Sequence, residues 1–324
     1  MNLSKVLTIF LLVLALAETS EAFFYPLGKV TLRVIDNEGQ PVENAAVTIR
    51  YDYAKGFGMG WGTSSKFVDG VTDKNGLYSL TKATPRRWFY MIRKEGYYSS
   101  GDTYEFKDNI ANLLWWPWDP TMEIKLKKVK NPTKMFVKNT MGMQIPVLNE
   151  PVGYDLEKGD WVAPHGKGVT SDFVFIFKIR FVKNDDWDAS YTLTFSNEQD
   201  GIQEYSIPKG NQSEYFWPYE APYDGYVHSL TLGAKNYSIG WGFQHKTDFK
   251  ENRNYIFRVR STKDNSGKII EAKYGRMHGD IIIDGWGSFR MEYYFNPSGT
   301  RSLEYDSNLF PDEKKDVLNQ NMEN

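Results

Sequence analysis

The sequence predicts an all-β protein built from two β-sandwich domains. The first observation is composition: aromatic residues make up 16% of the 324 residues, with 21 Tyr, 20 Phe and 10 Trp. They are interleaved with Val, Ile and Thr, a mixture that strands favour. The second is that apolar and polar residues alternate in short segments bounded by Gly, Asn, Asp and Pro. The third is that no helical pattern longer than about two turns precedes the polar tail from Pro311.

The N-terminal residues predict an exported chain. Lys5 precedes an apolar run at residues 6–17, and Ser20 and Ala22 are the small residues that a signal peptidase needs at −3 and −1. The run is shorter than the roughly 20 residues of a membrane-spanning helix, and no second such run follows. We therefore expect residues 1–22 to be a signal peptide cleaved after Ala22, a secreted or periplasmic location, and no transmembrane anchor after cleavage.

Charge and cysteine content narrow the class of protein. The chain has 39 Lys and Arg against 41 Asp and Glu, a net charge of −2, whereas nucleic-acid binding leaves a strongly basic footprint. A nucleic-acid partner is therefore not expected. The lack of cysteine excludes a disulfide framework and the lipid-carrying cysteine of a bacterial lipoprotein, and in an exported chain favours a bacterial periplasm or exterior.

The first domain is expected at residues 23–130. Residues 29–35 are apolar at every second position, which places Val30, Leu32 and Val34 on one face of a half-buried strand. The strand should end in the turn at residues 36–39, where Asp and Asn side chains bond their own backbone and Gly39 can take a positive φ. The same signals predict strands at residues 45–51, 77–80, 88–93 and 122–127 and a turn at residues 72–76.

This order of signals resembles the carboxypeptidase regulatory-like domain, a transthyretin-type β-sandwich. The matching positions are residues 34–36, Gly39, 41–42, Ala45, Val47, 72–73, 75–76, Tyr78, Lys94 and 96–97. The resemblance covers residues 28–128 and implies an immunoglobulin-like sandwich without catalytic activity. Insertions at residues 52–70 and 99–121 depart from the family pattern. We expect them to be long ordered loops, where binding tends to reside.

The second domain is expected at residues 131–306, after a charged stretch that ends at Pro132, and before a polar tail at residues 307–324. Residues 172–181 place Phe173, Phe175, Phe177, Ile179 and Phe181 on one face, as in a core strand. Further strands are predicted at residues 190–195, 226–232, 254–260, 269–274, 280–283 and 288–295, a spacing typical of a sandwich or jelly roll. Residues 159–164 and 294–297 resemble secreted bacterial proteins that carry no assigned activity.

Four tryptophans are the candidate ligand-binding residues. Trp61 lies in a glycine-rich stretch, residues 56–62, and Trp115, Trp116 and Trp118 stand together beside two prolines. Three indoles so close in sequence cannot all enter one small core, so at least one should meet a sugar ring, a protein partner or the other domain. The alternative is a hydrophobic plug between the two sandwiches.

No catalytic residue, metal site or cofactor is predicted. The four histidines, at positions 165, 228, 245 and 278, never stand two or four residues apart, and without cysteine they do not make a zinc motif. Ser79 and Lys82 match the Ser-x-x-Lys of penicillin-interacting enzymes in letters only, because this serine falls in a predicted strand. A carboxylate pair for glycoside hydrolysis stays open, since sequence gives no separation between carboxylates.

The sequence therefore favours an exported, non-catalytic binding or cell-envelope protein. The expected partner is a polysaccharide or an envelope protein, with carbohydrate contacted through the tryptophan-rich loops. Two alternatives remain open. One is a secreted carbohydrate-active hydrolase whose second sandwich holds a carboxylate pair, and the other is a structural or adhesive subunit that binds other proteins.

Overall fold

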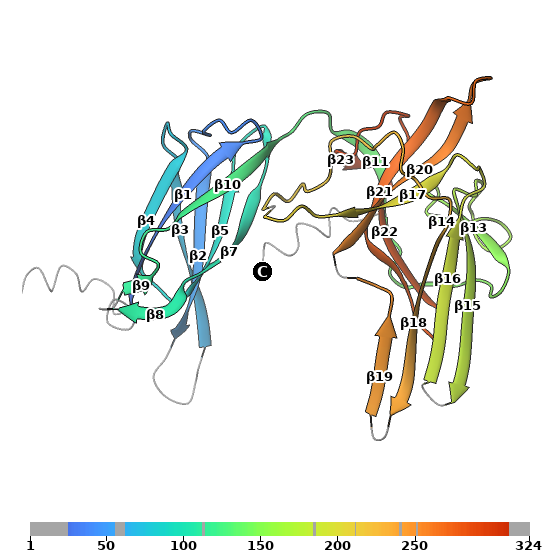
Figure 1. The fold of residues 1–324 in the computed structure, drawn as a ribbon, viewed down its shortest axis with the longest axis horizontal. Coiled ribbons are helices and arrows are strands. Elements are labelled where there is room, and N and C mark those ends of the chain that lie inside the picture. Colours follow the sequence, from blue (N-terminus) through green and yellow to red (C-terminus); the bar gives the residue numbers. More distant parts are fainter. Residues whose placement is uncertain are drawn as a thin grey trace, which may run out of the picture. The chain divides into compact units, whose positions relative to one another are not determined.

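The computed structural model describes residues 25–55, 62–111, 114–183, 186–210, 212–239, 242–250 and 252–310. Every regular element in these ranges is a β-strand, which confirms the predicted all-β class (Figure 1). The chain forms two compact units: unit 1 is Met1–Val129 with Gly210–Phe216, and unit 2 is Lys130–Lys209 with Trp217–Asn324. The expected signal peptide and the tail from Pro311 lie outside the described residues.

Unit 1 contains two β-sheets. The first has the order β6-β10-β1-β9-β8, with β4 also paired to β1. Its strands are β1 (Leu27–Asp36), β4 (Leu77–Ala83), β6 (Tyr97–Tyr98), β8 (Lys107–Ala111), β9 (Leu114–Trp116) and β10 (Thr121–Lys128). The second has the order β3-β2-β5-β7 and consists of β2 (Ala46–Lys55), β3 (Gly62–Val71), β5 (Arg87–Arg93) and β7 (Ser100–Glu105).

The core of unit 1 is built from the inward faces of these sheets. Val30, Leu32 and Val34 of β1 are buried together, as the alternation predicts. Their partners in one apolar cluster include Val47, Ile49 and Tyr51 of β2, Trp88, Tyr90 and Ile92 of β5, and Ile124 and Leu126 of β10. Unit 1 is therefore a β-sandwich with a continuous core.

The two predicted turns of unit 1 form as expected. The Asp36 carboxylate accepts hydrogen bonds from the N–H groups of Glu38 and Gln40, at 2.8 and 3.0 Å. Asp73 holds the second turn in the same way, and there Gly76 takes a φ of +72°. A Cβ at Gly76 would lie 2.3 Å from the carbonyl oxygen of Val34, so the position requires glycine.

The two insertions are largely strands, which corrects the expectation of long loops. β3 occupies much of residues 52–70, and β7, β8 and β9 occupy much of residues 99–121. β3 is the edge strand of its sheet. Its Gly-, Ser- and charge-rich sequence shows weak alternation because an edge strand has fewer neighbours to pack against.

A short segment from the middle of the predicted second domain belongs to unit 1. Residues Gly210–Phe216 are grouped with unit 1, and within them residues 212–214 pair with residues 99–101, where Ser100 and Ser213 form an antiparallel bridge. The ring of Tyr215 stacks on that of Tyr98, with centroids 4.5 Å apart. Local sequence patterns do not predict this placement, because both contacts join residues more than a hundred positions apart.

Unit 2 also contains two β-sheets. One has the order β17-β20-β21-β22-β11-β23, with β12 paired to β22, and the other has the order β14-β13-β15-β16-β18-β19. The strands are β11 (Thr133–Asn139), β12 (Met143–Gln144), β13 (Pro151–Asp155), β14 (Asp160–Trp161), β15 (Phe173–Lys183), β16 (Asp186–Thr194), β17 (Gly201–Ser206), β18 (Leu230–Ile239), β19 (Gly242–Thr247), β20 (Arg253–Lys263), β21 (Ile269–Ile283), β22 (Ser288–Asn296) and β23 (Tyr305–Asn308).

An aromatic core fills unit 2. Phe173, Phe175 and Phe177 of β15 are fully buried, as predicted, but Phe181 on the same strand is exposed. Its neighbour Val182 is exposed as well, and successive residues of a strand face opposite sides. Side chains on both faces at the end of β15 are therefore largely exposed to solvent. Figure 1 shows this end running out with β16, beside the β18–β19 hairpin.

β21 replaces two predicted strands. The expected segments at residues 269–274 and 280–283 are parts of one strand whose pairing with β22 shifts between His278 and Ile282. Gly279 takes a φ of +69° inside this bulge. Bulges bend a strand and re-aim its side chains, and here the bulge interrupted the alternation that sequence reasoning follows.

Candidate functional site

The adjacent tryptophans on and after β9 have different environments. Trp115 is 7% exposed, its ring lies against Phe106 with centroids 5.9 Å apart, and its Nε1 donates a hydrogen bond to the carbonyl oxygen of Thr84 at 2.7 Å. Trp115 is thus a core residue and leaves the set of ligand-binding candidates. Trp61 lies outside the described residues.

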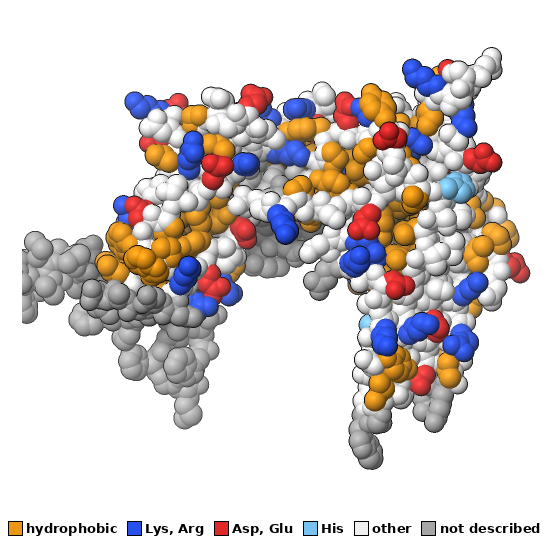
Figure 2. Space-filling view, in the orientation of Figure 1, with side chains coloured by type: hydrophobic (Ala, Val, Ile, Leu, Met, Phe, Trp, Pro, Cys, Tyr) orange, Lys and Arg blue, Asp and Glu red, His pale blue; other side chains and the backbone are white. Residues whose placement is uncertain are grey.

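Trp116 and Trp118 remain on the surface of unit 1, with exposed fractions of 53% and 40%. Leu27 of β1, whose backbone pairs with Leu114 of β9, is also exposed. Figure 2 shows hydrophobic side chains gathered on unit 1 near the end that carries β8 and β9 in Figure 1. We call residues 116–119, which are the last residue of β9 and the three residues after it, the tryptophan loop.

Asp119 fastens the tryptophan loop to β1. Its carboxylate accepts a hydrogen bond from the Thr31 hydroxyl and contacts the Lys29 ammonium, both at 2.7 Å, and its N–H donates to the Lys29 carbonyl oxygen. The hydrogen bonds from Lys29 and Thr31 lower the pKa of Asp119 below its ordinary value. The loop is therefore held in one arrangement before any ligand arrives.

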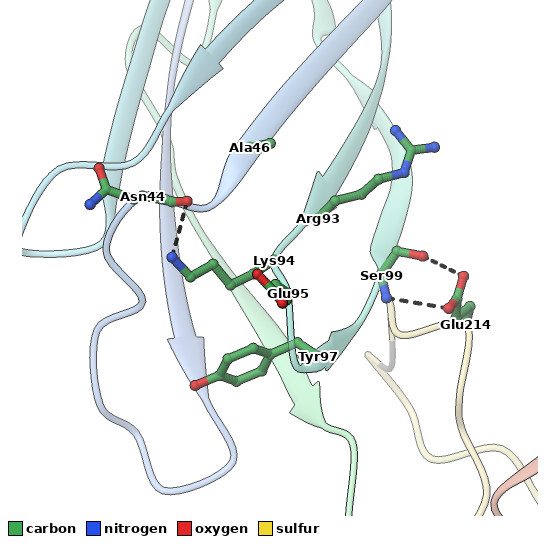
Figure 3. Close-up of a pocket in the computed structure, with 8 residues that line it drawn as sticks. All are labelled: Asn44, Ala46, Arg93, Lys94, Glu95, Tyr97, Ser99 and Glu214. Carbon is green, nitrogen blue, oxygen red and sulfur yellow. Dashed lines mark hydrogen bonds between the residues drawn. The ribbon is translucent and has the colours of Figure 1, made fainter. Parts of the chain in front are cut away.

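An open pocket of about 590 Å³ lies elsewhere on unit 1 (Figure 3). Arg93, Lys94 and Glu95 line one part of it, and Glu214 of the Gly210–Phe216 segment lines another. Figure 3 shows Glu214 turned toward Ser99, whose hydroxyl and N–H both donate to its carboxylate. Mixed charges and an open shape define no particular ligand here, and Glu214 is engaged in holding its own segment.

A second cavity, of about 580 Å³, lies in unit 2 at the bulge of β21, and we call it the bulge cavity. Its charged and polar wall residues include Asn139, Lys250, His278, Asp280, Arg290 and Glu292. His278 of β21 stands directly opposite Glu292 of β22, and Arg290 precedes Glu292 by two residues on the same face. The cavity thus gathers titratable groups from two central strands and from the loop before β20.

Asp280 is the anchor of this cavity. Arg253 donates two hydrogen bonds to its carboxylate, at 2.7 and 2.8 Å, and the Tyr255 hydroxyl donates a third. The N–H of Lys250 donates a fourth at 2.7 Å. Buried charges are tolerated when they are paired and fully hydrogen-bonded, and Asp280 meets both conditions. It fixes the bulge to the start of β20 and so positions Lys250.

His278 is held in one protonation state. Trp217 Nε1 and an Arg276 guanidinium nitrogen both donate toward its Nε2, at 3.3 and 2.9 Å, which places the ring proton on Nδ1. Burial, together with the positive charge of Arg276, lowers the pKa of His278 to about 3. The imidazole is therefore neutral across the physiological range.

Glu292 differs from an ordinary surface carboxylate in its burial and in its pKa. Burial raises its pKa, while Arg276 and Arg290 and a hydrogen bond from Tyr294 act against that rise. A titratable residue in a cavity whose pKa is shifted by burial and by neighbouring charges is a candidate functional residue. Of the two acids that line the bulge cavity, Glu292 is the one not fully occupied by an ion pair.

Neither a metal site nor a membrane-spanning helix is found in the described ranges. No group of three or more His, Asp or Glu side chains there is placed to hold a metal ion. The same part of the chain contains no helix with the length and apolarity needed to cross a bilayer.

Sequence reasoning missed most of the bulge cavity. The sequence marks His278 only as one of four scattered histidines, and it places Arg290 and Glu292 in the predicted strand at residues 288–295 without a role. A signal was present: residues 289–293 alternate large apolar side chains with Arg290 and Glu292, which places two charges on one face of a central strand.

The comparisons with known proteins identify no family. No protein-family model matches the chain, and no curated protein matches it. Solved structures that share some likeness include the 3-chlorocatechol 1,2-dioxygenase of Rhodococcus opacus 1CP, 18% identical with a TM-score of 0.24, over 32% of this chain and 61% of the dioxygenase. The chain thus spans less than two thirds of that enzyme.

Two further likenesses cover more of the chain. The shaft pilin SpaA of Lactobacillus rhamnosus GG is 13% identical with a TM-score of 0.22, over 87% of this chain and 96% of the pilin. The TIE protein of Bacillus anthracis is 9% identical with a TM-score of 0.23, over 87% of this chain and 50% of that protein. At such scores none of these proteins supplies a function for this chain.

Proposed function

We propose that the chain is an exported, non-catalytic binding protein that takes carbohydrate at the tryptophan loop. The observation that carries this proposal is the pair of exposed indoles, Trp116 and Trp118, on a loop that Asp119 holds against β1. Export rests on the signal features of residues 1–22, and the partner is a polysaccharide of the cell exterior or envelope.

The physical basis is the match between an indole face and a sugar ring. A pyranose presents a face of C–H groups that packs on an aromatic ring through apolar and quadrupole attraction. Burial of apolar surface contributes about 25 cal/mol per Å², so two indoles provide a useful share of a weak sugar affinity. Because Asp119 orders the loop beforehand, binding loses less conformational entropy.

The architecture of unit 1 is consistent with this role. The resemblance of residues 28–128 to the carboxypeptidase regulatory-like domain is retained as part of the proposal, and the β-sandwich of unit 1 supports it at the level of fold class. That family is non-catalytic and occurs appended to many secreted proteins.

The bulge cavity favours binding over glycoside hydrolysis in unit 2. A hydrolase needs two carboxylates, one to donate and one to accept a proton or attack the sugar. Of the acids that line the cavity, Asp280 accepts four hydrogen bonds from Arg253, Tyr255 and Lys250. A carboxylate engaged in this way is a structural anchor rather than a base, which leaves Glu292 without a working partner.

Retention on immobilised polysaccharides tests the proposal. The full chain without its leader would be compared with Trp116→Ala/Trp118→Ala and with Phe67→Ala, a matched control that removes another exposed aromatic of unit 1. We expect one or more polymers to retain the native chain and the control but not the double variant. Equal retention of all three, or retention by no polymer, would overturn the proposal.

A structural or adhesive subunit is the second candidate, favoured by apolar side chains at the hairpin ends of unit 2. Phe181, Val182, Ile239 and Phe243 are exposed there, and Trp286 lies against Phe181 with centroids 5.8 Å apart. Exposed apolar groups that gather at one place mark protein contacts. Self-association in sedimentation experiments, abolished by Phe181→Ser/Phe243→Ser, would select this function.

A further inference from the structure

The bulge cavity has the size and construction of a small-molecule site. Its volume of about 580 Å³ falls within the range of known ligand pockets, roughly 300 to 1,000 Å³. Its floor comes from β21 and β22, which lie in the middle of the sheet order. Groups mounted on central strands are held more precisely than groups on loops, so the cavity is largely formed before a ligand binds.

The cavity carries a net positive charge once its ion pairs are counted, although its lining contains two cations and two carboxyl groups. The charge of Asp280 is balanced by Arg253, whose guanidinium donates a hydrogen bond to each of the two Asp280 carboxylate oxygens. Lys250 and Arg290 also line the cavity, and neither forms a salt bridge within 4 Å among the described residues. Glu292 is the one acidic lining residue that remains to offset these two positive charges. The cavity therefore attracts an anion.

Arg290 is suited to pair with an oxyanion such as a carboxylate. A guanidinium presents parallel N–H donors that match the two oxygens of a carboxylate. It lies two residues from Glu292 on the same face of β22, with Asn139 on the neighbouring strand β11. Asn139 Nδ2 donates to Glu292 Oε2 at 3.5 Å, a long hydrogen bond that hydroxyl groups of a ligand could replace when its carboxylate lies at Arg290.

The remaining wall supplies an apolar surface. Phe249 and Ile282 line the cavity alongside the polar groups. A ligand that fits must therefore combine a carboxylate, several hydroxyl groups and a C–H face. A sugar acid has all three.

We infer that the bulge cavity is a binding site for a hexuronic acid, whose carboxylate pairs with Arg290 and Lys250 and whose hydroxyl groups meet Glu292 and Asn139. This site lies in unit 2, uses none of the residues of the tryptophan loop, and does not depend on the function proposed for that loop. The neutral imidazole of His278 adds no charge to the cavity.

Isothermal titration calorimetry of the leaderless chain tests this inference. Galacturonate and glucuronate would be titrated beside galactose, glucose and acetate. The two uronates should bind, the neutral sugars and acetate should bind about tenfold more weakly or not at all, and Arg290→Ala should weaken uronate binding about tenfold. Arg290→Lys keeps the positive charge but not the two parallel N–H donors of the guanidinium, so it should bind uronates more tightly than Arg290→Ala and more weakly than the native protein.

Two control variants test whether uronate binding belongs to this cavity. Arg180→Ala removes an exposed arginine of β15 outside the cavity and should leave uronate binding unchanged. Trp116→Ala/Trp118→Ala should also leave it unchanged. The inference is overturned if the uronates do not bind, if galactose and glucose bind equally well, or if the tryptophan variant loses uronate binding while Arg290→Ala keeps it.

Discussion

Trp115 and Trp116 are consecutive residues of β9, yet the first indole is 7% exposed and the second 53%. The difference follows from strand geometry, because successive side chains point to opposite faces of a sheet. One face of β9 meets Phe106 in the core of unit 1, and the other meets solvent. Two neighbouring residues of the same type therefore have different environments, one in the core of unit 1 and one at the surface, where we propose that it contacts the ligand.

Replacing these two tryptophans should separate the roles experimentally. Trp115→Ala leaves a cavity beside Phe106 and an unsatisfied carbonyl at Thr84, so the free energy of unfolding should fall by about 3–5 kcal/mol. Trp116→Ala should change it by less than about 1 kcal/mol. Urea unfolding followed by circular dichroism measures both, and equal losses would contradict the assignment.

Asp119→Ala should weaken polysaccharide retention while both exposed indoles remain in place. The substitution removes the contacts to Lys29 and Thr31, so the tryptophan loop loses the anchor that holds it before binding. We expect retention to fall several-fold, with a small change in the free energy of unfolding. Glu123→Ala, which breaks the exposed pair with Arg33, is the control. Comparable losses in both variants would argue against the anchoring role.

Asp280→Ala should destabilise unit 2 strongly. The substitution leaves the buried Arg253 guanidinium without its counter-ion, which typically costs about 3–5 kcal/mol. Arg180→Ala breaks an exposed pair with Asp188 and should cost less than about 1 kcal/mol. Guanidinium unfolding of both variants provides the comparison, and a mild effect of Asp280→Ala would show that the bulge does not need its anchor.

His278 should make the protein less stable as the pH falls. In the unfolded chain a histidine binds a proton below about pH 6.5, whereas burial and Arg276 lower the pKa of folded His278 to about 3. The unfolded state therefore binds more protons between these values, and His278 should remove up to about 1.4 kcal/mol of stability per pH unit as the pH drops.

The variant His278→Gln isolates this effect, because its amide oxygen can accept the same hydrogen bonds from Trp217 and Arg276. Glu292, the titratable residue opposite position 278, Arg290 beside it and Tyr294 are present in both proteins, so their contributions cancel in the first approximation. Unfolding free energies measured from pH 7 to pH 4 should fall more steeply in the native protein than in the variant. Parallel curves would show that His278 is not buried in its neutral form.

The parts of the fold that sequence predicted are those set by local rules. Val30, Leu32 and Val34 are buried because their alternation matches the strand period. Asp36 and Asp73 form turns because a carboxylate reaches the backbone two and four residues ahead. Neither feature needs information from a distant part of the chain.

The parts that sequence did not predict depend on distant partners. Trp115 could not be told from Trp116 without β9, a strand of three residues that lacks an alternating pattern. The bulge cavity needs the register that sets His278 against Glu292 and brings Arg253 to Asp280. The local pattern of apolar and polar residues does not predict such long-range pairings.

The position of residues Gly210–Phe216 determines when unit 1 can be finished during synthesis. The first 129 residues leave the ribosome before Ser213 and Tyr215 have been made, because a chain emerges from its N-terminus. During that interval the edge of β7 has unpaired backbone N–H and C=O groups, which can form hydrogen bonds with strands of other chains. A protein cut after Val129 would stay in that unfinished condition, so a soluble fragment of unit 1 has to carry both stretches of sequence.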